Sequence, residues 1–274
     1  MSSMLWIDTE GQRADLAEIT RDFLEMDVHP SAIEHMKKTT FEGRLPFPRL
    51  ECHTGYLFGV VYLPSDSSSL SPDFDRITFL ASHDRVIAST IEHSTSTIDW
   101  KGLRARLETN DPATESPIGG QFLLNLFQYV TKRLTDDAKN MEAFLASNTW
   151  RILGSVNLNE SVSNLLHTEH LRSRQRRLLL TQLRTLSITT YEIARLLPRM
   201  RRVAEETAVI LNSLMTNDPL RDLSRDQYGT ERELFSKYLE IRVGDTFLDA
   251  RILIGVIEEV NVLLNQLFEK TKQL

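Results

Sequence analysis

The chain has 274 residues, of which 41 % are hydrophobic, and a formal net charge of −6 at pH 7. A chain of this length and composition can bury a sizeable core, as one large domain or two ordinary ones. The negative charge argues against a general nucleic-acid binder, and the single cysteine, Cys52, excludes a disulfide framework and a cysteine-rich zinc site. The N-terminus has no basic segment followed by an apolar one, so we predict no secretory signal.

The first forty residues predict short elements. Residues 4–7 form a short apolar run typical of a strand, and residues 14–24 have apolar side chains at helical spacing behind the N-cap candidate Asp15. Pro30 suits the first turn of a second short helix. We therefore expect a strand and two helices before the main sheet.

From Arg49 the apolar pattern changes to a period of two. Runs rich in Val, Ile, Phe, Tyr and Thr follow at residues 50–53, 56–63, 76–81 and 86–91, and such runs are typical of strands. The serine-rich connection, residues 64–72, is most simply a solvated loop, with a phosphorylated or metal-binding loop as the alternative. Short connections favour hairpins, hence a largely antiparallel sheet with helices on at least one face.

After Gly119-Gly120 the pattern becomes helical. It predicts one long helix over residues 122–145, a second over 162–215 with Pro198 as a kink or break, and a third from about Leu234. The predicted fold class is therefore α+β: a mixed, largely antiparallel sheet flanked by helices, followed by long C-terminal helices forming a stalk. We expect an N-terminal α/β domain at residues 1–115 and a long-helix region at residues 116–274.

The terminal helix has the most unusual composition. Fourteen of the twenty-two residues from Phe247 to Phe268 are apolar, and at helical spacing they cover nearly the whole circumference. Such a helix must be buried on several sides or lie in lipid. Its longest apolar run, residues 252–257, is far shorter than the roughly 20 residues of a membrane span. Two interpretations follow: a central core helix of a monomer, or a stalk shared between identical subunits.

Motifs for chemistry are scarce. The sequence lacks the glycine-rich nucleotide loops, the zinc-protease helix and the serine-nucleophile turn. His167 and His170 share a helix face and could hold a metal, but with no third ligand they are more simply surface residues. The arginine-rich segment, residues 172–202, could bind phosphate or RNA, but it contains one aromatic residue, Tyr191, and is more simply a solvated face. We expect neither an enzyme nor a nucleic-acid partner.

Two segments of the N-terminal half carry recognisable motifs. The first is Asp27-Val-His-Pro-Ser-Ala-Ile-Glu34, and the second is Phe47-Pro-Arg-Leu-Glu51 followed by Tyr56-Leu-Phe-Gly-Val-Val-Tyr-Leu-Pro64. In order and spacing they resemble the cytoplasmic domain of the CorA family of divalent-cation channels, including its ZntB branch. The resemblance continues more loosely over almost the whole chain.

This resemblance implies a regulatory or funnel domain of a transporter for Mg²⁺, Co²⁺, Ni²⁺ or Zn²⁺, on the cytoplasmic side of the cell membrane, in a homo-oligomer that is a pentamer when intact. Family members continue from the stalk into two transmembrane helices with a Gly-Met-Asn motif, and this sequence ends at Leu274 with neither. We expect a piece that stops before the first span. The alternative is a soluble paralogue acting as an oligomeric scaffold or protein-interaction module.

The resemblance also implies a position for a regulatory cation. Magnesium-gated members carry an acid two residues before a tyrosine at the start of the stalk, and alignment on Tyr238 puts Ser236 there. A hydroxyl is a poor ligand for a hard cation, so we expect weak magnesium binding or none. A divalent cation, Mg²⁺ or Zn²⁺, is the only cofactor candidate. A displaced site would use acids that are more simply surface charges: Glu233, Glu240, Asp66 and Asp73.

Overall fold

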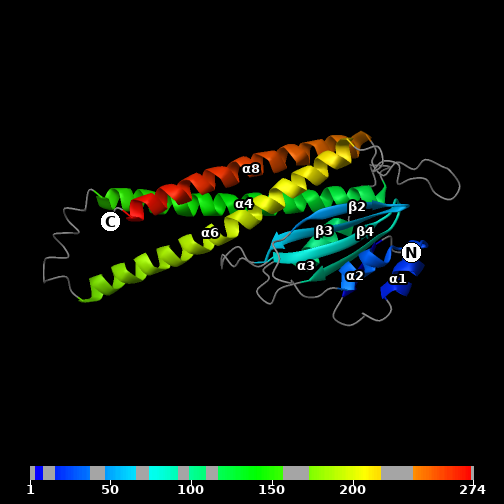
Figure 1. Ribbon diagram of the computed structural model, residues 1–274, viewed down its shortest axis with the longest axis horizontal. Helices are drawn as coiled ribbons and strands as arrows, with labels where there is room; N and C mark the ends of the chain where they lie inside the picture. Colours follow the sequence, from blue (N-terminus) through cyan, green and yellow to red (C-terminus); the bar gives the residue numbers. More distant parts are fainter. Residues whose placement is uncertain are drawn as a thin grey trace.

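A computed structural model describes residues 4–8, 16–37, 47–65, 74–91, 99–108, 117–156, 173–216 and 237–272 (Figure 1). In these ranges a five-stranded sheet lies at one end of the molecule and three long helices extend away from it. The predicted α+β fold with long C-terminal helices is confirmed.

The sheet is mixed, with one parallel pair. Its strands are β1 (Met4–Asp8), β2 (Arg49–His53), β3 (Tyr56–Pro64), β4 (Phe74–Ala81) and β5 (Val86–Ile91). Their order across the sheet is β1-β5-β4-β3-β2. Strands β2 to β5 pair antiparallel in succession, whereas β1 pairs with β5 in parallel, with Met4 opposite Val86. Gly55, in the turn between β2 and β3, has a φ of +86°, which glycine adopts without steric cost.

Helices cover both faces of the sheet. They are α1 (Leu16–Leu24) and α2 (Pro30–Lys37) on one face, and α3 (Trp100–Glu108) and α4 (Ile118–Val156) on the other. Because successive side chains point to opposite faces of a strand, Tyr56 and Phe58 pack toward α1 and α2, while Leu57 packs toward α3 and α4. The expected Pro30 start of the second helix is confirmed, and Asp15 lies outside the described residues.

The three long helices are α4, α6 (Ser173–Thr216) and α8 (Lys237–Lys272). In Figure 1, α4 and α8 run in the same direction. The helix α6 runs in the opposite direction, from the side where α4 ends to the side where α8 begins. The helix α6 passes through Pro198 without ending, so the proline does not break it. One hydrophobic core continues from the sheet along all three helices. The boundary between residues 1–115 and 116–274 stays a prediction.

Candidate functional site

The helix α8 has a buried side that packs against α4 and α6. Its buried apolar side chains, with the buried Thr246 among them, recur every three or four residues, which places them on one face. They are Val243, Ala250, Leu253, Ile257, Val260, Leu264 and Leu267. This face already satisfies the packing of α8 within one chain.

The opposite side of α8 carries several exposed apolar residues. Leu248 is 59 % exposed and Ile252 is 63 % exposed, and a Cβ added at Gly255 would meet no atom within 4 Å. We call this line the outer stripe: Ile241, Leu248, Ile252, Gly255 and Val262. The sequence led us to expect burial on several sides, and within one chain the structure buries only one.

An exposed ion-pair group connects α6 and α8. Arg201 of α6 lies 2.7 Å from Glu205, one turn along the same helix, and 3.4 Å from Glu258 of α8. The hydrogen bond to Glu205, together with both acids' charges, raises the pKa of Arg201. The group spans α6 and α8 on the surface, where such pairs contribute little to stability.

A polar groove lies beside the outer stripe, between α4 and α8. Its volume is about 590 Å³, and Ile252 of the outer stripe forms part of its wall. Thr131 and Thr246, both buried, line the groove. Its charged residues are three bases and three acids: Lys132, Lys139, Arg242, Asp136, Asp245 and Asp249. An apolar strip with a polar border of both signs is the usual anatomy of a protein interface.

Of the four acids predicted for a displaced cation site, the structure describes one, Glu240. Glu240 lies in the first turn of α8 and is half-buried. Glu233, Asp66 and Asp73 lie outside the described residues, as do Ser236, His167 and His170. Across the described ranges, no group of three or more His, Cys, Asp or Glu side chains is arranged to hold a metal. The displaced site therefore stays a prediction.

The motif residues near His29 hold α2 against the sheet. The ring of His29 accepts a hydrogen bond from the backbone N–H of Ser31 at 3.2 Å, as an N-cap does. Its own backbone N–H donates to the hydroxyl of Tyr56 at 2.8 Å, and the ring of His53 stacks 4.8 Å from that of Tyr56. Burial raises the pKa of Tyr56, partly offset by the hydrogen bond from His29. These contacts are architectural.

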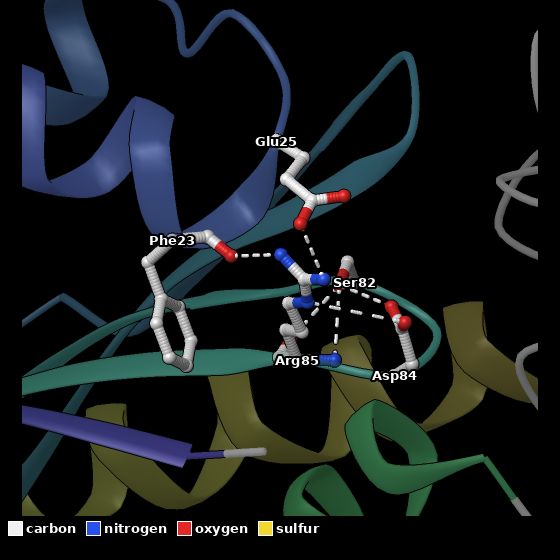
Figure 2. Close-up of polar contacts among 5 residues, drawn as sticks. All are labelled: Phe23, Glu25, Ser82, Asp84 and Arg85. Carbon is white, nitrogen blue, oxygen red and sulfur yellow. Dashed lines mark hydrogen bonds and ion pairs between the residues drawn. The ribbon is translucent and has the colours of Figure 1, made fainter. Parts of the chain in front are cut away.

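A second anchor joins α1 to the turn between β4 and β5 (Figure 2). The guanidinium of Arg85 donates to the carbonyl of Phe23 and, at 2.7 Å, to the carboxylate of Glu25. Glu25 has a φ of +56°, so the chain turns sharply where α1 ends. The hydroxyl of Ser82 accepts from the backbone N–H of Arg85 at 3.1 Å and shapes the turn. Sequence reasoning identified residues 82–85 as a connection and missed this contact.

Compared by sequence, the chain matches no protein-family model and no curated protein. Solved structures do match. The soluble domain of CorA from Methanocaldococcus jannaschii gives a TM-score of 0.56 at 13 % identity, over 96 % of this chain and 86 % of that one. The ZntB cytoplasmic domain from Vibrio parahaemolyticus RIMD 2210633 gives 0.51 at 11 % identity, over 100 % and 92 %. The chain has the fold of the CorA and ZntB cytoplasmic domains.

The complete CorA magnesium transporter from Methanocaldococcus jannaschii also matches, with a TM-score of 0.59 at 12 % identity, over 98 % of this chain and 69 % of that one. Identities this low establish the CorA-like fold and leave the activity to be argued from the site. None of these three structures is described as an enzyme. Among the helices in the described ranges, none has both the length and the apolarity to cross a membrane.

Proposed function

We propose that this chain is the cytoplasmic regulatory funnel domain of a CorA-like divalent-cation transporter, with α8 as the stalk shared between identical subunits. Three findings support the proposal: the CorA-like fold, the motif residues around His29 and Tyr56, and the two apolar sides of α8. The intact assembly would sit on the cytoplasmic side of the membrane, with α8 leading to the membrane part.

The outer stripe carries this proposal. Its members follow intervals of seven, four, three and seven residues, the spacing at which helices pack side by side in coiled coils. Burying apolar surface stabilises association by about 25 cal/mol per Å², and a cyclic homo-oligomer brings corresponding surfaces of every subunit into contact. Open space at Gly255 lets a neighbouring helix approach closely.

In this proposal a cation acts by biasing how the subunits pack. A ligand shifts such an equilibrium only through a difference in its affinity for the two arrangements. Since Ser236 occupies the position of the family's regulatory acid, gating in the parent would use another site or a mechanism like that of ZntB. Transport measurements with Mg²⁺, Co²⁺, Ni²⁺ and Zn²⁺ would assign the transported ion.

Light scattering over a concentration series tests the stalk. We expect the mean mass to rise with concentration and the rise to be lost in Leu248→Gln combined with Ile252→Gln. The matched control is Ile188→Gln combined with Val209→Gln, because these α6 side chains are also about half exposed. A chain that stays strictly monomeric up to about millimolar concentration, far above ordinary affinities, would rule out a stalk role for the outer stripe.

A variant at Gly255 distinguishes an effect on association from an effect on folding. Gly255→Ala should stabilise the isolated helix, because alanine is favoured over glycine by about 1 kcal/mol in a helix interior. The same change fills the space at the outer stripe and should weaken association. If association instead strengthens along with stability, close approach at Gly255 is excluded.

A further inference from the structure

The N-terminal half of α6 differs in charge from the rest of the chain. Between Ser173 and Tyr191 the sequence contains four arginines and no acid, although the chain as a whole carries a net charge of −6. The four are Arg174, Arg176, Arg177 and Arg184. A local excess of positive charge on an acidic protein attracts anionic partners to that part alone.

The helical register of α6 puts positions 174, 177 and 184, which carry arginine, in line with positions of exposed apolar residues further along the helix. Positions 174, 177, 181, 184, 188, 191 and 195 follow intervals of three and four residues, so they fall on one line along α6. At the described end of this line, Ile188 is 49 % exposed, Tyr191 is 67 % exposed, and Arg195 is exposed too. We call positions 174 to 195 the basic line. Arginines combined with an exposed tyrosine and isoleucine are typical of helices that contact lipid headgroups.

The start of α6 lies at one particular end of the molecule. In Figure 1 it is the end away from the sheet, where α4 and α8 also terminate, and the N-terminal half of α6 diverges from both helices. In the proposed function α8 leads toward the membrane at this end. The basic line therefore begins at the end of the molecule nearest to that membrane.

We propose that the N-terminal end of α6 binds the phosphate headgroups of anionic lipids in the membrane that the stalk enters. The proposal rests on the proposed function, which sets the direction of the membrane. The planar guanidinium group of arginine binds phosphate through two parallel hydrogen bonds. Each basic side chain close to an anionic surface strengthens association by about five-fold, and the attraction acts within about 8 Å at physiological salt.

Lipid fits these residues better than nucleic acid does. Single-stranded nucleic acid is held by aromatic side chains on which successive bases stack, and the basic line contains one aromatic residue, Tyr191. The acidic remainder of the chain also repels an extended polyanion, whereas a membrane surface contacts only the end presented to it.

Sedimentation with lipid vesicles tests this proposal on the full 274-residue chain. At physiological salt we expect binding to vesicles of phosphatidylglycerol mixed with phosphatidylcholine, and little to phosphatidylcholine alone. Arg174→Gln combined with Arg177→Gln should weaken binding roughly twenty-five-fold, at about five-fold for each arginine. The matched control, Arg21→Gln combined with Lys101→Gln, removes two exposed bases near the sheet and should leave binding unchanged. Circular dichroism verifies that both variants fold.

Several outcomes would overturn the lipid proposal. Equal binding to neutral vesicles, or equal losses in the two double variants, would show that the arginines of α6 do not recognise headgroups. Displacement by inorganic phosphate at matched ionic strength would identify free phosphate as the ligand. A single-stranded RNA oligonucleotide that binds more tightly than the vesicles at the same salt would favour nucleic acid.

The same samples separate this proposal from the proposed function. The Arg174→Gln and Arg177→Gln variant should associate like the wild type in light scattering, since the outer stripe is untouched. If the wild type associates but shows no preference for anionic vesicles, the lipid proposal alone is overturned. If the wild type prefers anionic vesicles but does not associate, the proposed stalk role of α8 is overturned instead.

Discussion

Gly59 has no room for a side chain. It lies in β3 opposite Phe79 of β4, and a Cβ at this position would collide with the Phe79 ring. That ring is fully buried and packs edge-on against Phe122 of α4, with the ring centroids 5.3 Å apart. Gly59 therefore makes space for the aromatic pair that joins the sheet to α4.

Gly59→Ala should lower the free energy of unfolding by about 2–3 kcal/mol, because an added methyl group strains a close-packed core. Gly244→Ala is the control: its Cβ would meet only the sulfur of Met215 at 3.6 Å, and in a helix the change should be neutral or stabilising by up to about 1 kcal/mol. Urea unfolding measures both. Comparable losses would mean that the collision with Phe79 is not the cause.

Two partly buried tyrosines, Tyr62 and Tyr129, make the stability of the fold depend on pH in the alkaline range. Burial raises the pKa of Tyr129, and nearby arginines, Arg133 foremost, partly offset the rise. Burial also raises the pKa of Tyr62, with Arg76 as the main offset. In the unfolded chain a tyrosine titrates near about pH 10. A pKa raised on folding gives stability that is complete below that pH and is lost as the pH rises through the folded pKa.

We therefore expect the free energy of unfolding to fall as the pH rises above about 10. Tyr129→Phe should make this decline shallower, because one group with a raised pKa has been removed. Urea unfolding between about pH 8 and 11 measures the slope. An unchanged slope in Tyr129→Phe would assign the decline to other groups.

Among the helices, α1 is joined to the β4–β5 turn by the polar contacts of Arg85. The side chain of Arg85 is about three-quarters buried, and it reaches both Phe23 and Glu25 where α1 ends (Figure 2). Cations near a helix C-terminus also interact favourably with its free carbonyl groups. The position of α1 over the sheet follows from this contact together with its apolar face.

Arg85→Gln should cost about 1–2 kcal/mol, the range for losing charge-assisted hydrogen bonds to partly buried groups. Amide hydrogen exchange in α1 should accelerate more than in α4. Arg21→Gln serves for comparison, since its nearest acid, Asp22, is 3.9 Å away on the surface and such pairs contribute less than about 1 kcal/mol. Uniform acceleration across both helices would point to global destabilisation.

The type of an element could be predicted where residues close together in the sequence determine it. Strands β2 to β5 begin and end within two residues of the expected runs, because alternating β-branched and aromatic residues and short connections specify hairpins. The helix α3 was missed, although Trp100, Leu103 and Leu107 bury one face of it. Its nine residues include three bases, and their charge masked the pattern.

Features that join residues far apart in the chain could not be predicted from the sequence, for a physical reason. The parallel register of β1 on β5 joins residues about eighty positions apart, and no turn residue fixes such a pairing. The contact of Arg85 with α1 likewise depends on the finished fold. For the candidate site, the apolar circumference of α8 was foreseen. Which side faces outward is decided by packing on α4 and α6, and no local pattern encodes it.

At the scale of the whole molecule, the open question is whether a divalent cation biases the assembly. We expect calorimetry with Mg²⁺ and Zn²⁺ to detect weak binding of magnesium or none, because the resemblance to magnesium-gated CorA members aligns Ser236 with their regulatory acid, and a hydroxyl is a poor ligand for a hard cation. Glu233→Ala combined with Glu240→Ala should then change little. A tight magnesium site that these two substitutions abolish would show that the carboxylates have moved along the chain and still form a site.

The parallel strand β1 also protects the molecule from aggregation. It has five residues and covers the outer edge of β5, a strand whose run Val-Ile-Ala-Ser-Thr-Ile has no charge and no proline. If β1 detaches, the backbone groups of β5 become an open, apolar edge, and such edges pair with other chains. Solubility therefore depends on a short N-terminal segment, and damage there should cause precipitation while the long helices remain folded.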